Sequence, residues 1–331
     1  MFIIESYGTA VFFCIITMLC WGSWANTQKM SSSSWRFELF YWDYVLGILV
    51  MTLLFAFTLG SSGPEGRSFL EDLRQADGAS IRSAIWGGIL FNAANILLVA
   101  AISIAGMSVA FPVGIGLALV IGVVVNYLDA PIGNKSLLFS GVALIIVAIL
   151  LNAYAYRKKQ GEQAPVSGKG LILSIIAGAL MGLFYKYVAN AMFPDFKHPQ
   201  DGKLSPYTAV FIFSIGILLS NILFNSLLMR FPFTGSPVRY KQYFAGNLRT
   251  HLTGVLGGMI WCLGMSFSII ASEKAGPAIS YGLGQGATIV AAIWGIFIWK
   301  EFSNASRSVH RILYLMLASY AVGLALIIYS R

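Results

Sequence analysis

Long apolar segments follow one another along almost the whole chain, and short polar or turn-forming segments separate them. A helix needs about 20 residues to cross the hydrocarbon layer of a bilayer. The pattern predicts ten spans of that length, at 6–28, 42–60, 82–104, 106–127, 136–156, 170–191, 207–229, 251–272, 276–299 and 309–329. The connections at 104–106 and 272–276 are so short that the helices on either side must form tight antiparallel hairpins.

The composition agrees with a membrane protein. Of the 331 residues, 57% are hydrophobic and 11% are charged, and the mean hydropathy is +0.76. A soluble domain carries about 25% charged residues, and its interior is too small for so much apolar surface. The excess must face lipid, so we expect an all-α membrane protein. The first segment is predicted to be a spanning helix and not a signal peptide, because Glu5 precedes it without any Lys or Arg.

Lys and Arg are unevenly divided between the two faces that ten alternating spans define. One face carries eight of them: Arg67, Arg74, Arg82, Lys135, Lys197, Lys203, Lys274 and Arg331. The other face carries thirteen: Lys29, Arg36, Arg157, Lys158, Lys159, Lys169, Arg230, Arg239, Lys241, Arg249, Lys300, Arg307 and Arg311. Cytoplasmic loops are enriched in these residues. We therefore expect the second face in the cytoplasm, both termini outside, and the chain in a bacterial inner (plasma) membrane. The net charge of +9 then needs no nucleic-acid partner.

The two halves of the chain match at a constant offset of 170 residues, for example from 87 to 257. The matches are Gly87-Gly88 with Gly257-Gly258, Ala105-Gly106 with Ala275-Gly276, and Gly114 and Gly116 with Gly284 and Gly286. Five spans per half is an odd number, so the second half must enter the membrane in the opposite sense. This predicts two inverted five-helix repeats, an architecture of secondary transporters. The boundaries are 1–156 for the first repeat, 157–169 for a basic central loop and 170–331 for the second repeat.

Several segments resemble the drug/metabolite transporter superfamily, in its branch of sugar and metabolite importers. Residues 87–128 are similar to the third and fourth helices of ureide permeases and of the rhamnose-proton symporter, and 40–44 (FYWDY) resembles the start of the second ureide permease helix. Residues 257–261 (GGMIW) and 299–305 (WKEFSNA) resemble segments of the rhamnose symporter and the glucose/ribose porter families. The resemblance implies ten helices, proton- or sodium-driven uptake, a sugar or ureide-like substrate and a cytoplasmic central loop.

Polar and aromatic side chains within the third and eighth spans are candidates for substrate binding. Asn92 and Asn95 are three residues apart and share a helix face, and Trp261 lies in the matching region of the eighth span. Amides that bond hydroxyl groups, together with an indole that stacks on a sugar ring, would suit a carbohydrate pocket. The alternative is that the asparagines form interhelical hydrogen bonds, which polar residues in membranes commonly do.

Two further groups complete the predicted pocket. Tyr281 and Gln285 interrupt the small-residue pattern of the ninth span, and Gln285 lies between two glycines where neighbouring backbones approach closely. Trp24 and Asn26 end the first span, where an interfacial belt is an equal alternative.

Charged residues within spans are costly and usually functional. Asp43 is a candidate for ion coupling, with a helix N-cap as its alternative role. Lys186 is the other candidate, although its stem is long enough to reach the surface and pair there with Asp195 or Asp129.

We therefore expect a secondary active transporter that imports a small neutral polar metabolite, with a sugar as the expected substrate, by proton or sodium symport and alternating access. A ureide or nucleobase importer and a drug or metabolite exporter are alternatives. A membrane enzyme is not expected, because no nucleophile, paired-acid or metal-ligand pattern appears within the spans, and no cofactor is expected beyond the coupling ion. The partners are the solute and the bilayer. A monomer is sufficient because one chain contains both repeats, although a dimer would also satisfy the pattern.

Overall fold

Every predicted span forms helix in the computed structural model, which describes residues 1–31, 35–105, 107–160 and 167–331. The helices are α1 (Tyr7–Ser23), α2 (Asn26–Met30), α3 (Phe37–Phe57), α4 (Phe69–Gln75), α5 (Gly78–Ala105), α6 (Met107–Asp129), α7 (Lys135–Gln160), α8 (Gly168–Ala191), α9 (Pro206–Arg230), α10 (Tyr240–Phe244), α11 (Leu248–Ala275), α12 (Pro277–Gln285), α13 (Ala287–Ile293), a π-helical segment η1 (Trp294–Ile298), and α14 (Arg307–Ile328). Within the described ranges there is no β-strand, only an isolated bridge between Met192 and Leu204. The all-α membrane fold is therefore confirmed.

Nine helical segments within the described residues are long and apolar enough to cross a membrane, and α1 is a shorter apolar helix of 17 residues. The ninth predicted span is built from α12, α13 and η1 in succession.

The first predicted span was expected to continue to residue 28, but α1 ends at Ser23 and a separate short helix, α2, follows. At this break Asn26 and Thr27 donate side-chain hydrogen bonds to the carbonyls of Ser23 and Trp24. Such local bonds compete with helix continuation.

Side-chain caps explain where several spans begin. Ser6, Ser205, Asn247 and Ser306 each accept a bond from a backbone N–H in the first turn of α1, α9, α11 and α14, as N-cap residues do. The α3 helix begins earlier than predicted, at Phe37 instead of 42. Asp43 therefore lies in the second turn of α3, and its alternative role as a helix N-cap is wrong.

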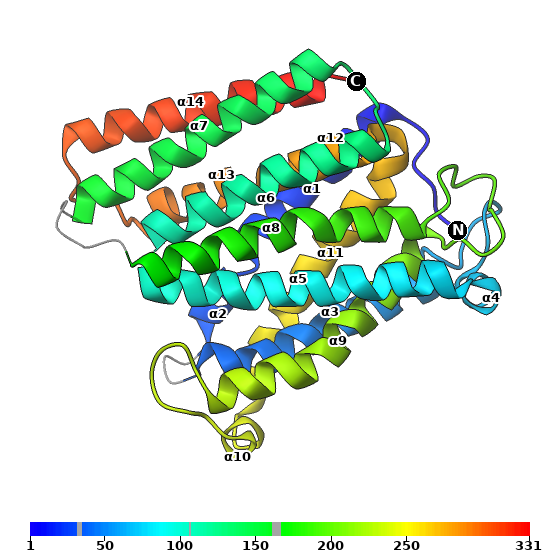
Figure 1. The fold of residues 1–331 in the computed structure, drawn as a ribbon, viewed down its shortest axis with the longest axis horizontal. Coiled ribbons are helices and arrows are strands. Elements are labelled where there is room, and N and C mark those ends of the chain that lie inside the picture. Colours follow the sequence, from blue (N-terminus) through cyan, green and yellow to red (C-terminus); the bar gives the residue numbers. More distant parts are fainter. Residues whose placement is uncertain (32–34, 106, 161–166) are drawn as a thin grey trace.

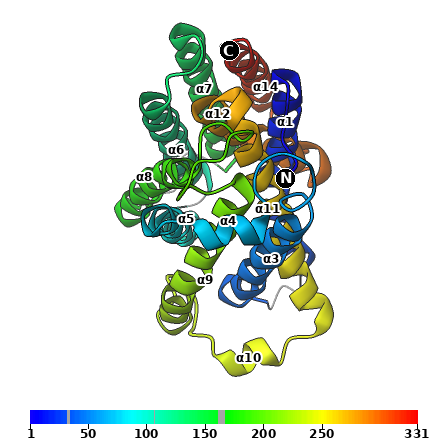
Figure 2. The ribbon, with the colours of Figure 1, turned by 90° about the vertical axis from the view of Figure 1, so that its right-hand side faces the viewer.

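The spans lie roughly side by side in one bundle (Figure 1). The α7–α14 pair forms one edge of the bundle, and α3 and α9 form the opposite edge, with the remaining long helices between them (Figure 2). In the middle, α8 packs against both α5 and α6, while α11 packs against α1 and α3. The two halves of the chain are therefore interleaved, and helices of one half cover helices of the other.

Glycines at matching positions of the two halves allow matching helix contacts. A Cβ atom on Gly88 of α5 would collide with the carbonyl of Phe213 on α9, and one on Gly258 of α11 would collide with the carbonyl of Tyr44 on α3. In each case the third span of one half crosses the second span of the other half with the two backbones in contact. Gly106, part of the second match, lies outside the described residues.

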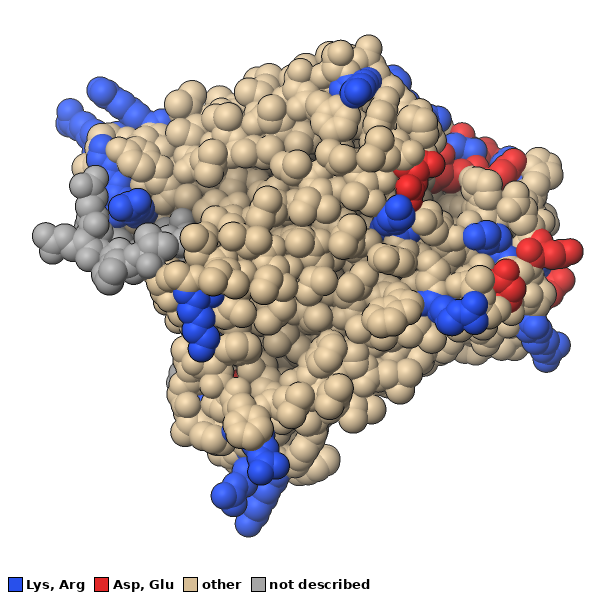
Figure 3. All heavy atoms as spheres, viewed as in Figure 1, with Lys and Arg blue, Asp and Glu red and all other residues tan. Residues whose placement is uncertain are grey.

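The connections gather at two ends that differ in charge. Asp and Glu side chains visible in Figure 3 gather at the end where α4 lies, interspersed with Lys and Arg, whereas the opposite end shows Lys and Arg. We call these the mixed end and the basic end. The basic central loop is shorter than expected: α7 continues to Gln160, so Arg157, Lys158 and Lys159 form its last turn, and α8 begins at Gly168. Cations are favourable at a helix C-terminus because of the helix dipole. Residues 161–166 of this loop lie outside the described ranges.

Candidate functional site

A cavity of about 400 Å³ lies between the two halves of the chain, with walls from α1, α2, α3, α5, α6, α7, α8, α11, α12, α13 and η1. Most of the wall is aromatic or aliphatic, and a few polar side chains interrupt it. The polar and charged lining residues are Asn26, Gln28, Lys29, Asn95, Asn152, Tyr156, Gln285, Thr288 and Glu301. An apolar cavity with a few polar groups is the usual form of a small-molecule site.

Flat aromatic faces make up much of the wall. The rings of Trp21 and Trp261 are nearly parallel, with an interplanar angle of 9° and centroids 6.0 Å apart. Phe91 packs on Trp261 at 4.2 Å between centroids. The Trp21 indole N–H also donates to the Trp261 carbonyl at 3.2 Å, which holds α1 against α11. Trp261 is 5% exposed because these rings cover it, so the partly exposed Trp21 is the indole on which a planar solute can stack.

Asn95 is held in one orientation by a chain of hydrogen bonds. Its Nδ2 donates to the Tyr41 hydroxyl at 3.1 Å, and that hydroxyl donates to Oδ1 of Asn92 at 2.9 Å. Asn92 in turn donates to the hydroxyl of Ser220 at 2.9 Å. One of the two Nδ2 hydrogens of Asn95 is engaged in this way, so Asn95 keeps Oδ1 as an acceptor and one N–H as a donor for a solute.

Two more amides line the cavity. Oδ1 of Asn152 on α7 is buried and has no hydrogen-bond partner among the described residues, and an unpaired buried acceptor costs about 1–3 kcal/mol. Gln285 ends α12, and only Gly286 separates it from the start of α13. Breaks of this kind in spanning helices often mark solute sites in transporters.

Charged and polar groups surround the mouth of the cavity at the basic end. Tyr156 donates to Oε2 of Glu301 at 2.5 Å, and Lys29 lies 3.5 Å from Oε1 of the same carboxylate. Trp299 donates to Oδ1 of Asn26 at 2.7 Å. Lys300, between Trp299 and Glu301, has a φ of 51°, which is uncommon for a residue with a side chain. These bonds tie α2 to the end of the ninth span across the mouth.

A buried layer closes the cavity toward the mixed end. The Tyr185 hydroxyl bonds to the carbonyl and the hydroxyl of Ser268 at 3.1 and 3.0 Å. The hydroxyls of Ser268 and Ser280 are 3.0 Å apart, and Cys14 approaches Ser280. All four side chains are fully buried. Lys29 and Glu301, which line the cavity at the basic end, have side chains that are 52% and 30% exposed, so the cavity opens at that end.

Of the seven residues predicted to bind substrate, five line this cavity: Trp24, Asn26, Asn95, Trp261 and Gln285. Asn92 and Tyr281 do not line it. A residue three positions before Asn95 is turned about 60° around the helix, and this directs the Asn92 amide toward α3 and α9. Tyr281 is fully buried and donates to the carbonyls of Ala118 and Met181, so it joins α12 to α6 and α8.

Neither residue predicted to couple an ion lines the cavity. Asp43 is 2% exposed and lies between α3 and α11. Its carboxylate accepts a bond from the Tyr243 hydroxyl at 2.7 Å and lies 2.9 Å from Nδ1 of His251. Burial, together with the Asp43 carboxylate, raises the pKa of the Tyr243 hydroxyl, so this hydroxyl stays a donor. Lys186 forms an ion pair with Asp129 at 3.0 Å, about one third exposed, which is one of the two surface pairings considered from the sequence.

Sequence reasoning missed Asn152, Tyr156, Glu301 and His251. Asn152 and Tyr156 are four residues apart near the end of the fifth span, which is a signal that the sequence does contain. Glu301 follows the ninth span, where a charged side chain is expected in solvent. His251 lies at a helix end without any metal-ligand spacing, and it is 208 residues away from Asp43 in the sequence. Only the packing of α3 against α11 brings that pair together.

Comparisons with known proteins indicate a transporter. Ureide permease 1 of Arabidopsis thaliana is 25% identical over 100% of this chain and 99% of its own length, and Ureide permease 2 of the same plant is 23% identical over the same shares. The Glucose uptake protein GlcU of Bacillus subtilis is 25% identical over 69% of this chain and 68% of its own length. These named relatives are permeases and an uptake protein.

A solved structure described only as "Crystal structure of protein" has a TM-score of 0.62 and 13% identity, over 96% of this chain and 97% of that chain. At that identity it shows a shared fold alone. The sequence profile of the ureide permease family matches residues 40–169 and 158–330, which is nearly the whole chain. This chain therefore belongs to the ureide permease family and is a transporter.

Proposed function

We propose that this transporter imports a small planar metabolite rich in amide groups, such as a ureide or a nucleobase, and that the central cavity binds it. The observation that supports this most directly is the wall of the cavity, which carries five amide side chains beside the stacked indole rings of Trp21 and Trp261. The ureide permeases match this chain over their full lengths, whereas the glucose uptake protein matches over about two thirds. The ureide alternative is therefore preferred to the sugar expected from the sequence.

The chemistry of the amides fits such a solute. Asn95 presents an acceptor, Asn152 has an unpaired buried acceptor, and Gln285 carries both an acceptor and a donor. Ureides and nucleobases offer N–H and C=O groups in one plane, so their edges can pair with amides while their faces stack on Trp21. A protein site built to pair such groups rejects solutes that lack them, because its own polar groups would then stay unpaired.

A sugar is the second candidate substrate. Its hydroxyl groups can also pair with amides, and its ring can lie on an indole face. GlcU of Bacillus subtilis and the Putative sugar uptake protein lin0215 of Listeria innocua, which is 28% identical over 65% of this chain, support this candidate.

We further propose that uptake is coupled to a proton or sodium gradient through Asp43 and that the two halves act as inverted repeats. The equivalent contacts of Gly88 and Gly258 support the repeat, because they make the same helix crossing in both halves. The cavity that is accessible at the basic end and closed at the mixed end would be one of the two states of alternating access.

The membrane orientation is part of the proposal, with the basic end in the cytoplasm. The native cysteines Cys14, Cys20 and Cys262 are buried, so a cysteine introduced at exposed Ser62 (mixed end) or Ser303 (basic end) supplies the reactive thiol. In intact cells, a membrane-impermeant maleimide should label Ser62→Cys and not Ser303→Cys. The reverse result would invert the orientation.

The test of function is uptake into proteoliposomes of labelled allantoin, uracil, rhamnose, glucose and ribose, with and without an imposed pH or sodium gradient. We expect gradient-driven accumulation of allantoin or uracil. Accumulation of a sugar alone would favour the second candidate, and efflux of hydrophobic cations without any accumulation would contradict import.

A cavity variant connects the transport to the site. Asn95→Leu removes the acceptor and should reduce uptake at least tenfold. The matched control is Asn190→Leu, because Asn190 is an exposed asparagine at the mixed end. Equal uptake by both variants would show that the solute binds elsewhere.

A further inference from the structure

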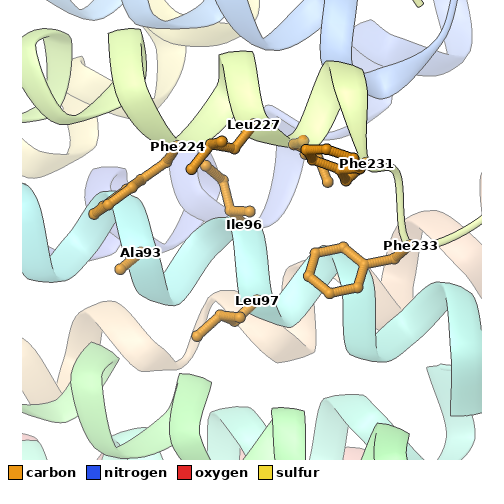
Figure 4. Close-up of a pocket in the computed structure, with 8 residues that line it drawn as sticks. Ala93, Ile96, Leu97, Phe224, Leu227, Phe231 and Phe233 are labelled. Atoms are coloured by element: carbon orange, nitrogen blue, oxygen red, sulfur yellow. The ribbon is translucent and has the colours of Figure 1, made fainter. Parts of the chain in front are cut away.

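A second, apolar crevice lies on the side of the bundle, between α5 and α9. Its volume is about 300 Å³. Ala93 and Ile96 of α5 form one wall, Phe224 and Leu227 of α9 form the other, and Phe231 and Phe233 line the end beyond α9 (Figure 4). Almost no polar atom is exposed on these walls.

The crevice exists because α5 and α9 touch at one point and then separate. Gly88 brings the α5 backbone against α9 near Phe213, and Gly216 of α9 lies against the Ile85 carbonyl. From this contact α9 runs away from α5 toward α10 (Figures 1 and 2). The side chains that follow the contact are too far apart to fill the wedge between two membrane-spanning helices. Hydrocarbon can enter it from the side.

Positive charge lies at the open end of the crevice. The Arg230 guanidinium is 5.4 Å from the centroid of the Phe231 ring, which lines the crevice. Arg230 is exposed and has no ion pair among the described residues. The segment that follows carries Arg239, Lys241 and Arg249, and no Asp or Glu occurs between 230 and 250.

The segment after α9 is held in position. Arg36 donates hydrogen bonds to the carbonyls of Thr234 and Ser236, and the Val238 N–H bonds to the Met229 carbonyl at 2.9 Å. In the same segment Phe231, Phe244 and Leu248 are 67%, 78% and 73% exposed. Exposed apolar and cationic side chains in one short segment beside a spanning helix are typical of contact with anionic lipid.

We propose that the α5–α9 crevice binds one phospholipid with an anionic headgroup. One acyl chain fills the wedge between Ala93 and Leu227, and the phosphate lies against Arg230. A polar solute would leave its own groups unpaired on these walls, and a neutral hydrocarbon would make no use of the cations. An anionic phospholipid satisfies both features, because cations near a membrane surface attract anionic headgroups.

The test is lipid binding by native mass spectrometry of the full-length purified protein, with palmitoyl-oleoyl phosphatidylglycerol and with the phosphatidylcholine of the same chains. We expect the wild type to retain phosphatidylglycerol with at least fivefold higher occupancy than phosphatidylcholine. Arg230→Gln should remove most of this preference. Ala93→Phe should reduce the binding of both lipids, because the ring occupies the wedge.

Two control variants make the same changes elsewhere. Arg311→Gln removes an exposed arginine at the basic end, on α14, and Ala143→Phe adds a ring to an exposed position of α7; neither should change lipid binding. Circular dichroism establishes folding, and Leu227→Trp replaces Ala93→Phe if the latter does not fold. Equal occupancy of the two lipids overturns the proposal, as does wild-type binding in Arg230→Gln or in the crevice-filling variant.

Discussion

At the scale of single residues, the hydrogen bonds behind the cavity matter as much as the groups within it. Asn95 faces the solute, but Tyr41, Asn92 and Ser220 determine which end of its amide is presented. These three are positioning residues. An amide that is free to rotate offers a donor as often as an acceptor, so its value for recognition depends on this support.

Replacing Tyr41 with Phe removes the hydroxyl that holds Asn95 and leaves the ring. A lost buried hydrogen bond costs about 1–3 kcal/mol, so the KM for the transported solute should rise between several-fold and about a hundredfold, with a smaller effect on the maximal rate. Tyr314→Phe, at a 68% exposed position, is the control. A KM unchanged from wild type would remove Tyr41 from the recognition chain.

Asn152→Leu should separate binding from stability. Its Oδ1 is buried without a partner among the described residues, so removing the amide should leave the Tm of the empty protein unchanged or higher while it weakens solute binding. Asn126→Leu is the contrast, because Asn126 is buried and donates to the Gly122 carbonyl at 2.7 Å; its Tm should fall. Thermal unfolding in detergent, with and without solute, measures both effects. A lower Tm for Asn152→Leu would contradict the assignment.

At the scale of elements, the ninth span differs from its neighbours because it is assembled from three short helices. Gly286 separates α12 from α13, and η1 completes the span before the strained residue Lys300. The interruption places Gln285 at the cavity, and η1 carries the chain to Glu301 at the mouth. Local irregularity is tolerated at membrane depth where the backbone lines a cavity.

The glycine crossings predict matched losses of stability. Gly88→Ala and Gly258→Ala each place a methyl group against a carbonyl of the facing helix, and both should lower the Tm clearly. Gly116→Ala meets no atom within 4 Å and should be neutral or stabilising, since alanine favours helix by about 1 kcal/mol. Unfolding scans of the three variants test this. A lower Tm in only one of the variants Gly88→Ala and Gly258→Ala would contradict the equivalence of the two helix crossings.

At the scale of the whole molecule, the cavity and the buried Asp43–His251 pair lie in different places, but α3 contributes a residue to each. Phe37 of α3 lines the cavity, and Asp43 lies between α3 and α11, where His251 and Tyr243 contact it. A change in the charge of this pair would alter the α3–α11 contact, which joins one half of the chain to the other. This makes coupling at a distance physically reasonable.

Asp43→Asn removes the charge with little change in shape. We expect it to abolish concentrative uptake in proteoliposomes while exchange of labelled solute continues, because exchange needs no net movement of the coupling ion. Asp195→Asn, at an exposed position of the mixed end, is the control. Concentrative uptake equal to wild type in Asp43→Asn would disprove this role.

Much of the architecture was predictable because a bilayer imposes one simple rule, an apolar helix of about 20 residues for each crossing. All ten segments, the alternating ends and the approximate boundaries follow from that rule. The errors occur where side chains bond to local backbone, as at the end of α1, or where a helix gains an extra turn, as at the start of α3.

The sequence by itself determined that the chain is a helical membrane protein, which polar side chains lie within its spans and how charge divides between its ends, because these depend on local composition and on the fixed thickness of a membrane. Only the tertiary structure decided which of these side chains share a cavity. Asn95 and Asn92 are three residues apart, yet one faces the cavity and the other faces α9. Asp43 and His251 are 208 residues apart and lie in contact. Which side chains face a cavity or touch one another depends on the rotation of each helix about its axis and on which helices are its neighbours. The hydropathy pattern along the chain gives no information on either.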